Sequence, residues 1–96
     1  MVGIDVVEVD RLRAVLQRSP GMEHKLFTDH ERGYCRSKPD PVRHFAGTLA
    51  AKEAVIKAAR LGPLISWARR IEVSRDGEGV PTVTIDGNSS PVHISI

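Results

Sequence analysis

The stretch HFAGTLAAKEAVIKAA, residues 44–59, decides how this chain folds. At helical period it is apolar or small nearly all the way round, with Phe45, Leu49 and Ile56 on one stripe. A neighbouring stripe holds only small side chains, those of Gly47, Ala51, Ala54 and Ala58. A helix without a polar face is typical of a buried position, so we predict a central helix that buries most of its surface.

Three charged side chains interrupt this apolar helix, at Lys52, Glu53 and Lys57. Burying an unpaired ammonium or carboxylate group is costly, so the three charges need an explanation. Glu53 and Lys57 are four residues apart and can support each other as an ion pair, whereas Lys52 points into the apolar stripe. Two interpretations stay open: the charges belong to a functional site, or they are structural, with lysine stems lying along apolar surface.

The composition indicates a single small domain over residues 1–96. A hydrophobic share of 41% over 96 residues is ordinary for a chain that holds one core. Cys35 is the single cysteine, which excludes an internal disulfide. We find no secretory signal and no apolar run of membrane-spanning length, and we expect a cytoplasmic protein with no membrane partner.

Basic residues gather in one part of the chain although the formal net charge is only +2. Residues 11–43 hold eight Lys or Arg against four acidic residues. Arg11 and Arg18 are seven residues apart and share one outward helix face. A solvated basic face is the ordinary interpretation, and an acidic partner is the functional one. Nucleic acid is not expected, because aromatic residues make up only 4% of the chain.

The first half of the chain predicts a short strand and then helices. Residues 2–7 have the pattern of a buried strand, and residues 9–18 have an apolar stripe at helical period. Residues 22–35 form a weaker helical region, in which Thr28 three residues before Glu31 predicts a capping box and a helix start.

The second half predicts a hairpin and a last strand. Leu61-Gly62-Pro63 ends the central helix, and residues 64–70 are expected in a loop or short turn. Residues 71–74 and 81–85 alternate as two strands of a hairpin, and residues 92–96 alternate again. These elements predict an α+β fold, in which a small antiparallel sheet packs against the long central helix.

Asp5 is a carboxylate inside the apolar run of residues 2–7, and Gly3 leaves space beside it. An aspartate in this position can form a cap or turn for the following helix. It can also be a ligand for a hard cation. The residues themselves leave both interpretations open.

Taken in order, the motifs of this chain resemble those of holo-acyl-carrier-protein synthases, the small 4′-phosphopantetheinyl transferases. The likeness covers essentially the whole chain and is specific because the motifs keep their order. The motifs are Gly3-Ile4-Asp5 followed by Arg11, Phe27-Thr28 with Glu31, Phe45-Ala46-Gly47, Ala50-Ala51-Lys52-Glu53-Ala54 with Lys57, Ile71-Glu72-Val73, Gly79, Pro81 and His93-Ile94-Ser95-Ile96.

The resemblance implies an activity and a set of site residues. It implies Mg²⁺-dependent transfer of 4′-phosphopantetheine from coenzyme A to a serine of a carrier protein, with release of adenosine 3′,5′-bisphosphate. Asp5 and Glu53 would hold the Mg²⁺ on the pyrophosphate, and Glu53 and Lys57 would act in catalysis. Lys52, Lys57 and Gly47 would lie beside the bound coenzyme A.

The resemblance also implies the partners. The substrate would be an acyl carrier protein, or a polyketide or peptidyl carrier domain, which is an acidic helical bundle in this family. Arg11 and Arg18 would lie on the face that receives it. Such chains assemble as homotrimers with active sites between subunits, so we expect a homotrimer.

Two departures from the family pattern lead to an alternative hypothesis. Thr48 stands where the family commonly has an arginine, which removes an expected phosphate or adenine-side contact. The sequence ends at Ile96, directly before a Ser/Thr-His step and a closing strand, which would leave an unpaired edge at residues 92–96. Because such edges are normally covered, we expect either a longer native polypeptide, of which this is a C-terminally truncated form, or a subunit contact that covers this strand. The alternative is therefore a catalytically weak or inert carrier-protein-binding module of the same fold.

Overall fold

The computed structural model of the chain describes residues 6–89. The elements in order are α1 (Val6–Arg18), α2 (Gly21–Leu26), α3 (Asp29–Arg36), α4 (Pro41–Ala59), α5 (Leu64–Trp67), β1 (Ile71–Arg75), β2 (Pro81–Ile85) and β3 (Asn88–Ser89). Asp5 and the strand predicted at residues 92–96, with His93, lie outside the described residues.

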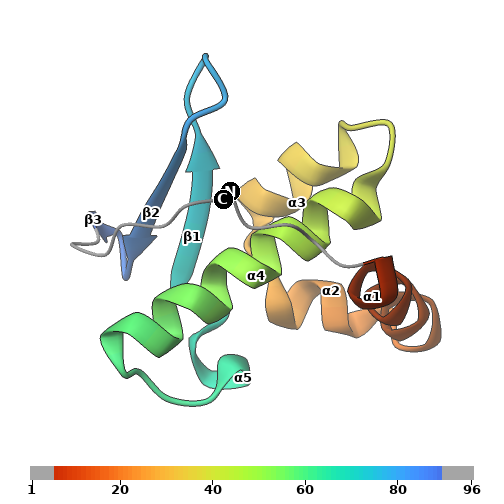
Figure 1. Ribbon diagram of the computed structural model, residues 1–96, viewed down its shortest axis with the longest axis horizontal. Coiled ribbons are helices and arrows are strands. Elements are labelled where there is room, and N and C mark those ends of the chain that lie inside the picture. The colour runs from red at the N-terminus through yellow and green to blue at the C-terminus, as the bar shows by residue number, and fades with distance from the viewer. Residues whose placement is uncertain (1–5, 90–96) are drawn as a thin grey trace.

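Helix α4 lies between the other long helices and the sheet (Figure 1). It contacts α1 and α3 on one side and β1 on another. The three described strands form one sheet in the order β1-β2-β3, and both pairings are antiparallel. The predicted α+β fold, a small antiparallel sheet against a long central helix, is confirmed.

The β1–β2 hairpin has the predicted position and turn. Val73 pairs with Val83 across the two strands. Oδ1 of Asp76 accepts hydrogen bonds from the backbone N–H groups of Glu78 at 2.8 Å and Val80 at 2.9 Å. Gly79 has φ +81°, a left-handed conformation that glycine adopts without strain. Local turn chemistry therefore determines the hairpin.

The predicted strand at residues 2–7 is wrong at its end, because α1 already begins at Val6. The run of valines there has the β-branched composition of a strand. Val9 and Leu12, however, are buried and continue at helical spacing, and α1 packs on α4 through this stripe. Tertiary packing outweighs the local β preference of the valines.

Helix α3 begins as predicted with a capping box. The Thr28 hydroxyl accepts a hydrogen bond from the backbone N–H of Glu31 at 3.2 Å. The Glu31 carboxylate in turn accepts one from the backbone N–H of Thr28 at 2.8 Å. Two of the N–H groups left open at the helix start are thereby satisfied.

Helix α4 begins at Pro41, three residues before the apolar stretch 44–59, and ends with that stretch at Ala59. Pro41 suits the first helical position because its fixed φ is helical and it has no N–H to satisfy. At the other end Arg60 adopts a left-handed conformation with φ 53°, and Gly62 and Pro63 follow. A Cβ on Gly62 would lie 3.0 Å from Nε1 of Trp67, so glycine lets α5 pack over this turn.

The main core lies between α4 and helices α1–α3. Its centre is the ring pair of Phe27 and Phe45, with centroids 4.6 Å apart. The other buried members of this cluster are Val9, Leu12, Leu26, Cys35, Ala46 and Ala68.

One face of α4 stays open to solvent, contrary to the prediction that this helix buries most of its surface. Glu53, Ala54 and Lys57 are exposed, and Gly47 and Ala50 are half-buried. Helices α1 and α3 contact α4 on one side, and β1 and α5 also contact it, and within the described part of the chain these contacts leave Glu53, Ala54 and Lys57 at the surface.

Candidate active site on helix α4

Lys52 lies inside the molecule and is fully buried. Its Nζ is 2.6 Å from Oε1 of Glu31 and donates to the backbone carbonyl oxygens of Leu26, at 2.9 Å, and Ala68. An ammonium group has three donors, and all three are used within the chain. This position differs from the predicted contact of Lys52 with the phosphates of coenzyme A, because no donor of Lys52 is left for a ligand.

The carboxylate of Glu31 joins two further parts of the fold to this ammonium group. It accepts hydrogen bonds from the backbone N–H groups of Thr28 and Val73, each at 2.8 Å. The Thr28 hydroxyl donates to Glu72 on β1 at 2.6 Å. Burial lowers the pKa of Lys52, and the negative charge of Glu31 opposes that effect. The ion pair therefore ties α4 to α2, α3, α5 and β1.

The fixed position of Lys52 sets the direction of Glu53. Successive residues of a helix are turned by about 100°, so a lysine held in the core turns the next side chain toward the open side. Glu53 and Lys57 both lie exposed on that side, one turn apart. Among the described residues no ion pair joins them, so the predicted mutual support of Glu53 and Lys57 is absent here.

Gly47 lies on the same open side of α4, between one and two turns before Glu53. A Cβ at Gly47 would meet no atom within 4 Å, so the surface around it has room for a ligand or a second chain. Three predicted site residues, Gly47, Glu53 and Lys57, are thus brought to one helix face, and Lys52 is not among them.

The open face fits one part of a Mg²⁺ site. Mg²⁺ takes oxygen ligands, keeps several waters and is often held by one or two carboxylates together with substrate phosphates. The exposed carboxylate of Glu53 is a suitable ligand of this kind. Among the described residues no group of three or more acidic, histidine or cysteine side chains gathers in one place. Asp5, the other predicted ligand, is outside the described residues.

Thr48 faces the interior rather than the open face of α4. It is buried, its hydroxyl donates to the backbone carbonyl of His44 at 2.9 Å, and its Oγ1 lies 3.8 Å from Sγ of Cys35. Position 48 therefore packs α4 against α3 in this chain.

Arg11 and Arg18 are exposed on α1, as the helical spacing predicts. Arg11 lies 3.3 Å from Glu8, and both side chains are more than 60% exposed. An ion pair with this exposure contributes little to stability, so the guanidinium group can exchange Glu8 for another acidic group.

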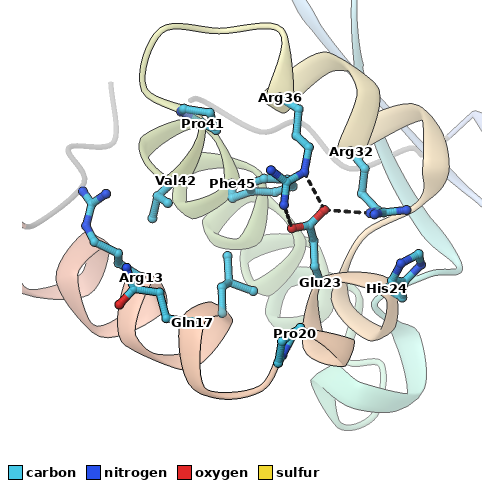
Figure 2. Close-up of a pocket in the computed structure, with 11 residues that line it drawn as sticks. Arg13, Gln17, Pro20, Glu23, His24, Arg32, Arg36, Pro41, Val42 and Phe45 are labelled. Carbon is cyan, nitrogen blue, oxygen red and sulfur yellow. Dashed lines mark hydrogen bonds and ion pairs between the residues drawn. The ribbon is translucent and has the colours of Figure 1, made fainter.

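A groove that the sequence does not predict opens between α1, α2, α3 and the start of α4 (Figure 2). Its volume is about 420 Å³. In Figure 2 the carboxylate of Glu23 points to Arg32 and Arg36, and Arg13 lies on the other side of the groove. Glu23 accepts hydrogen bonds from Nε of Arg32 at 2.8 Å and Nε of Arg36 at 3.0 Å. Burial alone would raise the pKa of Glu23, but Arg36 and Arg32 together hold it below its usual value.

No local signal in the sequence shows this cluster, because Glu23 lies nine residues before Arg32 and on a different helix. Glu23 is 9 residues from Arg32 and 13 from Arg36, whereas side chains that pair on one helix are three or four residues apart. Only the position of α2 beside α3 in the folded chain brings these side chains together.

All of residues 1–96 match the family described as the 4′-phosphopantetheinyl transferase superfamily. The chain belongs to this superfamily. The family and the enzyme class predicted from the motifs are thereby confirmed.

Individual members of the 4′-phosphopantetheinyl transferase superfamily match between 78% and 99% of this chain. A holo-acyl-carrier-protein synthase of Chlorobaculum parvum is 39% identical over 98 residues, which cover 99% of this chain and 83% of the relative. One of Caldanaerobacter subterraneus is 35% identical over 92 residues, covering 95% and 72%. One of Chlamydia trachomatis is 45% identical over 78 residues, covering 78% and 65%. In the described part of this phosphopantetheinyl transferase, no helix has the length and apolar character needed to cross a membrane.

Proposed function

We propose that this chain transfers 4′-phosphopantetheine from coenzyme A to a serine of an apo acyl carrier protein. The relatives named as holo-acyl-carrier-protein synthases support this substrate pair. The observation that carries the proposal within the structure is the exposure of Glu53 and Lys57 on one face of α4, next to a buried Lys52.

The proposed reaction is an attack of the serine hydroxyl oxygen on the phosphorus that carries pantetheine. A new P–O bond forms, the pyrophosphate P–O bond breaks, and adenosine 3′,5′-bisphosphate leaves with the bonding electrons. The serine proton goes to solvent or to a basic group. Negative charge gathers on the phosphate oxygens, where the Lys57 ammonium group offsets it.

Glu53 is the proposed anchor of a Mg²⁺ ion, with Asp5 as the second carboxylate. Mg²⁺ neutralises charge on the pyrophosphate oxygens when it is bound. Two observations support this role. The Glu53 side chain is exposed, and the buried ion pair of the preceding residue, Lys52, with Glu31 fixes this part of the α4 backbone. Gly47 is proposed to give coenzyme A close access to the helix.

Arg11 and Arg18 are the proposed first contacts of the carrier protein. Both guanidinium groups are exposed, and an acidic partner is steered toward such groups over several ångströms. We further propose a homotrimer in the cytoplasm. The small residues on the open face of α4, Gly47, Ala50 and Ala54, support this assembly because they let another subunit approach closely.

The test is to incubate the chain with coenzyme A, Mg²⁺ and an apo acyl carrier protein and to follow the intact mass of the carrier. The proposal expects the mass of one phosphopantetheine group to be added, and only when Mg²⁺ and coenzyme A are both present. Carrier binding in a calorimeter without any mass gain would instead support the inert binding module.

A further inference from the structure

We propose that the groove between α1, α2, α3 and the start of α4 binds an acidic, partly apolar segment of the carrier protein. We call it the Arg13–Arg36 groove. Its lining residues are Arg13, Leu16, Gln17, Pro20, Glu23, His24, Arg32, Arg36, Pro41, Val42 and Phe45. This inference rests on the proposed function, and it extends the carrier-protein surface beyond Arg11 and Arg18.

The surface around the groove is more basic than the sequence count suggests. Residues 11–43 hold four acidic side chains, of which Glu23 is only 5% exposed and Glu31 only 1%. The two that remain at the surface, Asp29 and Asp40, already lie 3.8 Å and 3.4 Å from arginines. Five of the eight basic residues of this segment are exposed and three, Arg13, Arg32 and Lys38, are half-buried, and little acidic surface lies among them.

Glu23 holds two guanidinium groups at the rim of the groove. It contacts Nε and one terminal nitrogen of Arg36 and Nε of Arg32, and all of these contacts lie at the wall seen in Figure 2. A guanidinium group has five N–H donors, so Arg36 keeps donors for a second carboxylate. The side chain of Arg36 is 60% exposed, which leaves those donors accessible. One carboxylate against two guanidinium groups leaves the rim positive.

The floor of the groove is apolar. Leu16, Val42 and Phe45 line it, and in Figure 2 Val42 and Phe45 lie between Arg13 and the Glu23 cluster. A free inorganic anion gains nothing from such a floor. An amphipathic segment with acidic and apolar side chains fits both the floor and the rim. The carrier protein, expected as an acidic helical bundle, has this chemistry.

The exposed surface of α1 connects the groove to the proposed first contacts. At about 100° per residue, Arg11 and Arg18 lie on one side of the helix, and Gln17 lies at the groove edge. Exposed Ala14 lies between them, and its short side chain does not block a partner. One globular partner seated on Arg11 and Arg18 can therefore reach over Ala14 into the groove.

The test uses Arg13→Gln and Arg36→Gln, with Arg75→Gln as a control that removes the same charge from β1. Carrier binding is measured by calorimetry in the absence of coenzyme A, so the result does not depend on transfer. We expect each groove variant to weaken carrier binding about tenfold, which corresponds to about 1.4 kcal/mol. Arg75→Gln should change it by less than about twofold, and coenzyme A affinity should stay within about twofold in all three variants.

Three outcomes overturn the inference: unchanged carrier binding in both groove variants, an equal loss in Arg75→Gln, or a parallel loss of coenzyme A affinity. Loss of binding to a single-stranded oligonucleotide, with carrier binding intact, would also overturn it in favour of a nucleic acid. Because Arg36→Gln can disturb α2–α3 packing, hydrogen exchange of the wild-type chain provides a second measurement. Carrier binding should slow exchange in peptides over residues 20–36, and unchanged exchange there contradicts the proposal. A failure of phosphopantetheine transfer with intact carrier binding would overturn the proposed function and leave the groove in place.

Discussion

Nζ of Lys52 lies 2.6 Å from Oε1 of Glu31, and both side chains are at most 1% exposed. The two residues are 21 positions apart, and their pairing joins the middle of α4 to the capping box of α3. The next residue after this buried lysine, Glu53, is exposed. Two adjacent charged residues therefore differ in role: Lys52 stabilises the fold through its buried ion pair, and Glu53 is available at the surface to a ligand.

Lys52→Met should strongly destabilise the chain, because it leaves the Glu31 carboxylate buried without its cation. We expect a loss of about 3–5 kcal/mol in the free energy of unfolding. Urea denaturation followed by circular dichroism measures it, with Glu53→Gln as the matched exposed control. A loss below about 1 kcal/mol for Lys52→Met would show that the pair does not hold the fold.

Lys57→Met should affect transfer and leave stability unchanged. Removal of an exposed lysine that offsets charge on the phosphate oxygens should lower kcat about 100-fold. The free energy of unfolding should change by less than about 0.5 kcal/mol, since the residue has no buried contact. Full activity in this variant would remove Lys57 from the proposed site.

Glu23 should make the chain acid-sensitive. Its pKa is lowered in the folded state, so its contribution to stability is present above the usual value of 4.5 and is lost as the pH falls through the lowered value. Glu23→Gln should therefore be less stable than the wild type at neutral pH, with a gap that narrows on acidification below about pH 4.5. Unfolding free energies at several pH values test this, and a constant gap contradicts it.

Cys35 should be unreactive in the folded chain. Burial raises the pKa of its thiol, and the side chain is fully enclosed beside Thr48. The thiolate is the reactive form, so labelling by a thiol reagent at neutral pH should be far slower in the native state than in urea. Rapid labelling without denaturant would contradict the enclosed position.

Arg11→Glu should weaken carrier binding far more than coenzyme A binding, because docking depends on charge complementarity. Titration calorimetry with each ligand separates the two effects. Equal losses for both ligands would remove Arg11 from the carrier surface.

The sequence predicts the parts of this fold that local chemistry determines. The capping box of Thr28 and Glu31, the hairpin turn at Asp76 and the end of α4 near Gly62 each depend on a few neighbouring residues, and each forms as predicted. The strand prediction is wrong at residues 6 and 7, because α1 begins at Val6 and continues at helical spacing through the buried Val9 and Leu12.

The candidate site was harder to predict because it depends on contacts between distant residues. Periodicity places Lys52 on the apolar stripe, but nothing in the spacing shows that Glu31 meets it there. Periodicity also suggests that Glu53 is buried, since Leu49, Ala50 and Ile56 lie three or four residues away on α4. The structure leaves that face of α4 uncovered by α1–α3 and by β1. The Arg13–Arg36 groove has no signature in the sequence because four helices build it.

The most direct measurement of the central claim is the intact mass of an apo acyl carrier protein incubated with coenzyme A, Mg²⁺ and one of three forms of this chain. The forms are the wild type, Glu53→Gln and Glu78→Gln, which alters an exposed glutamate in the hairpin turn. We expect the wild type and Glu78→Gln to add one phosphopantetheine group to the carrier, and Glu53→Gln to add none while remaining folded. Transfer by Glu53→Gln at the wild-type rate, or no mass gain with the wild type, would contradict the account.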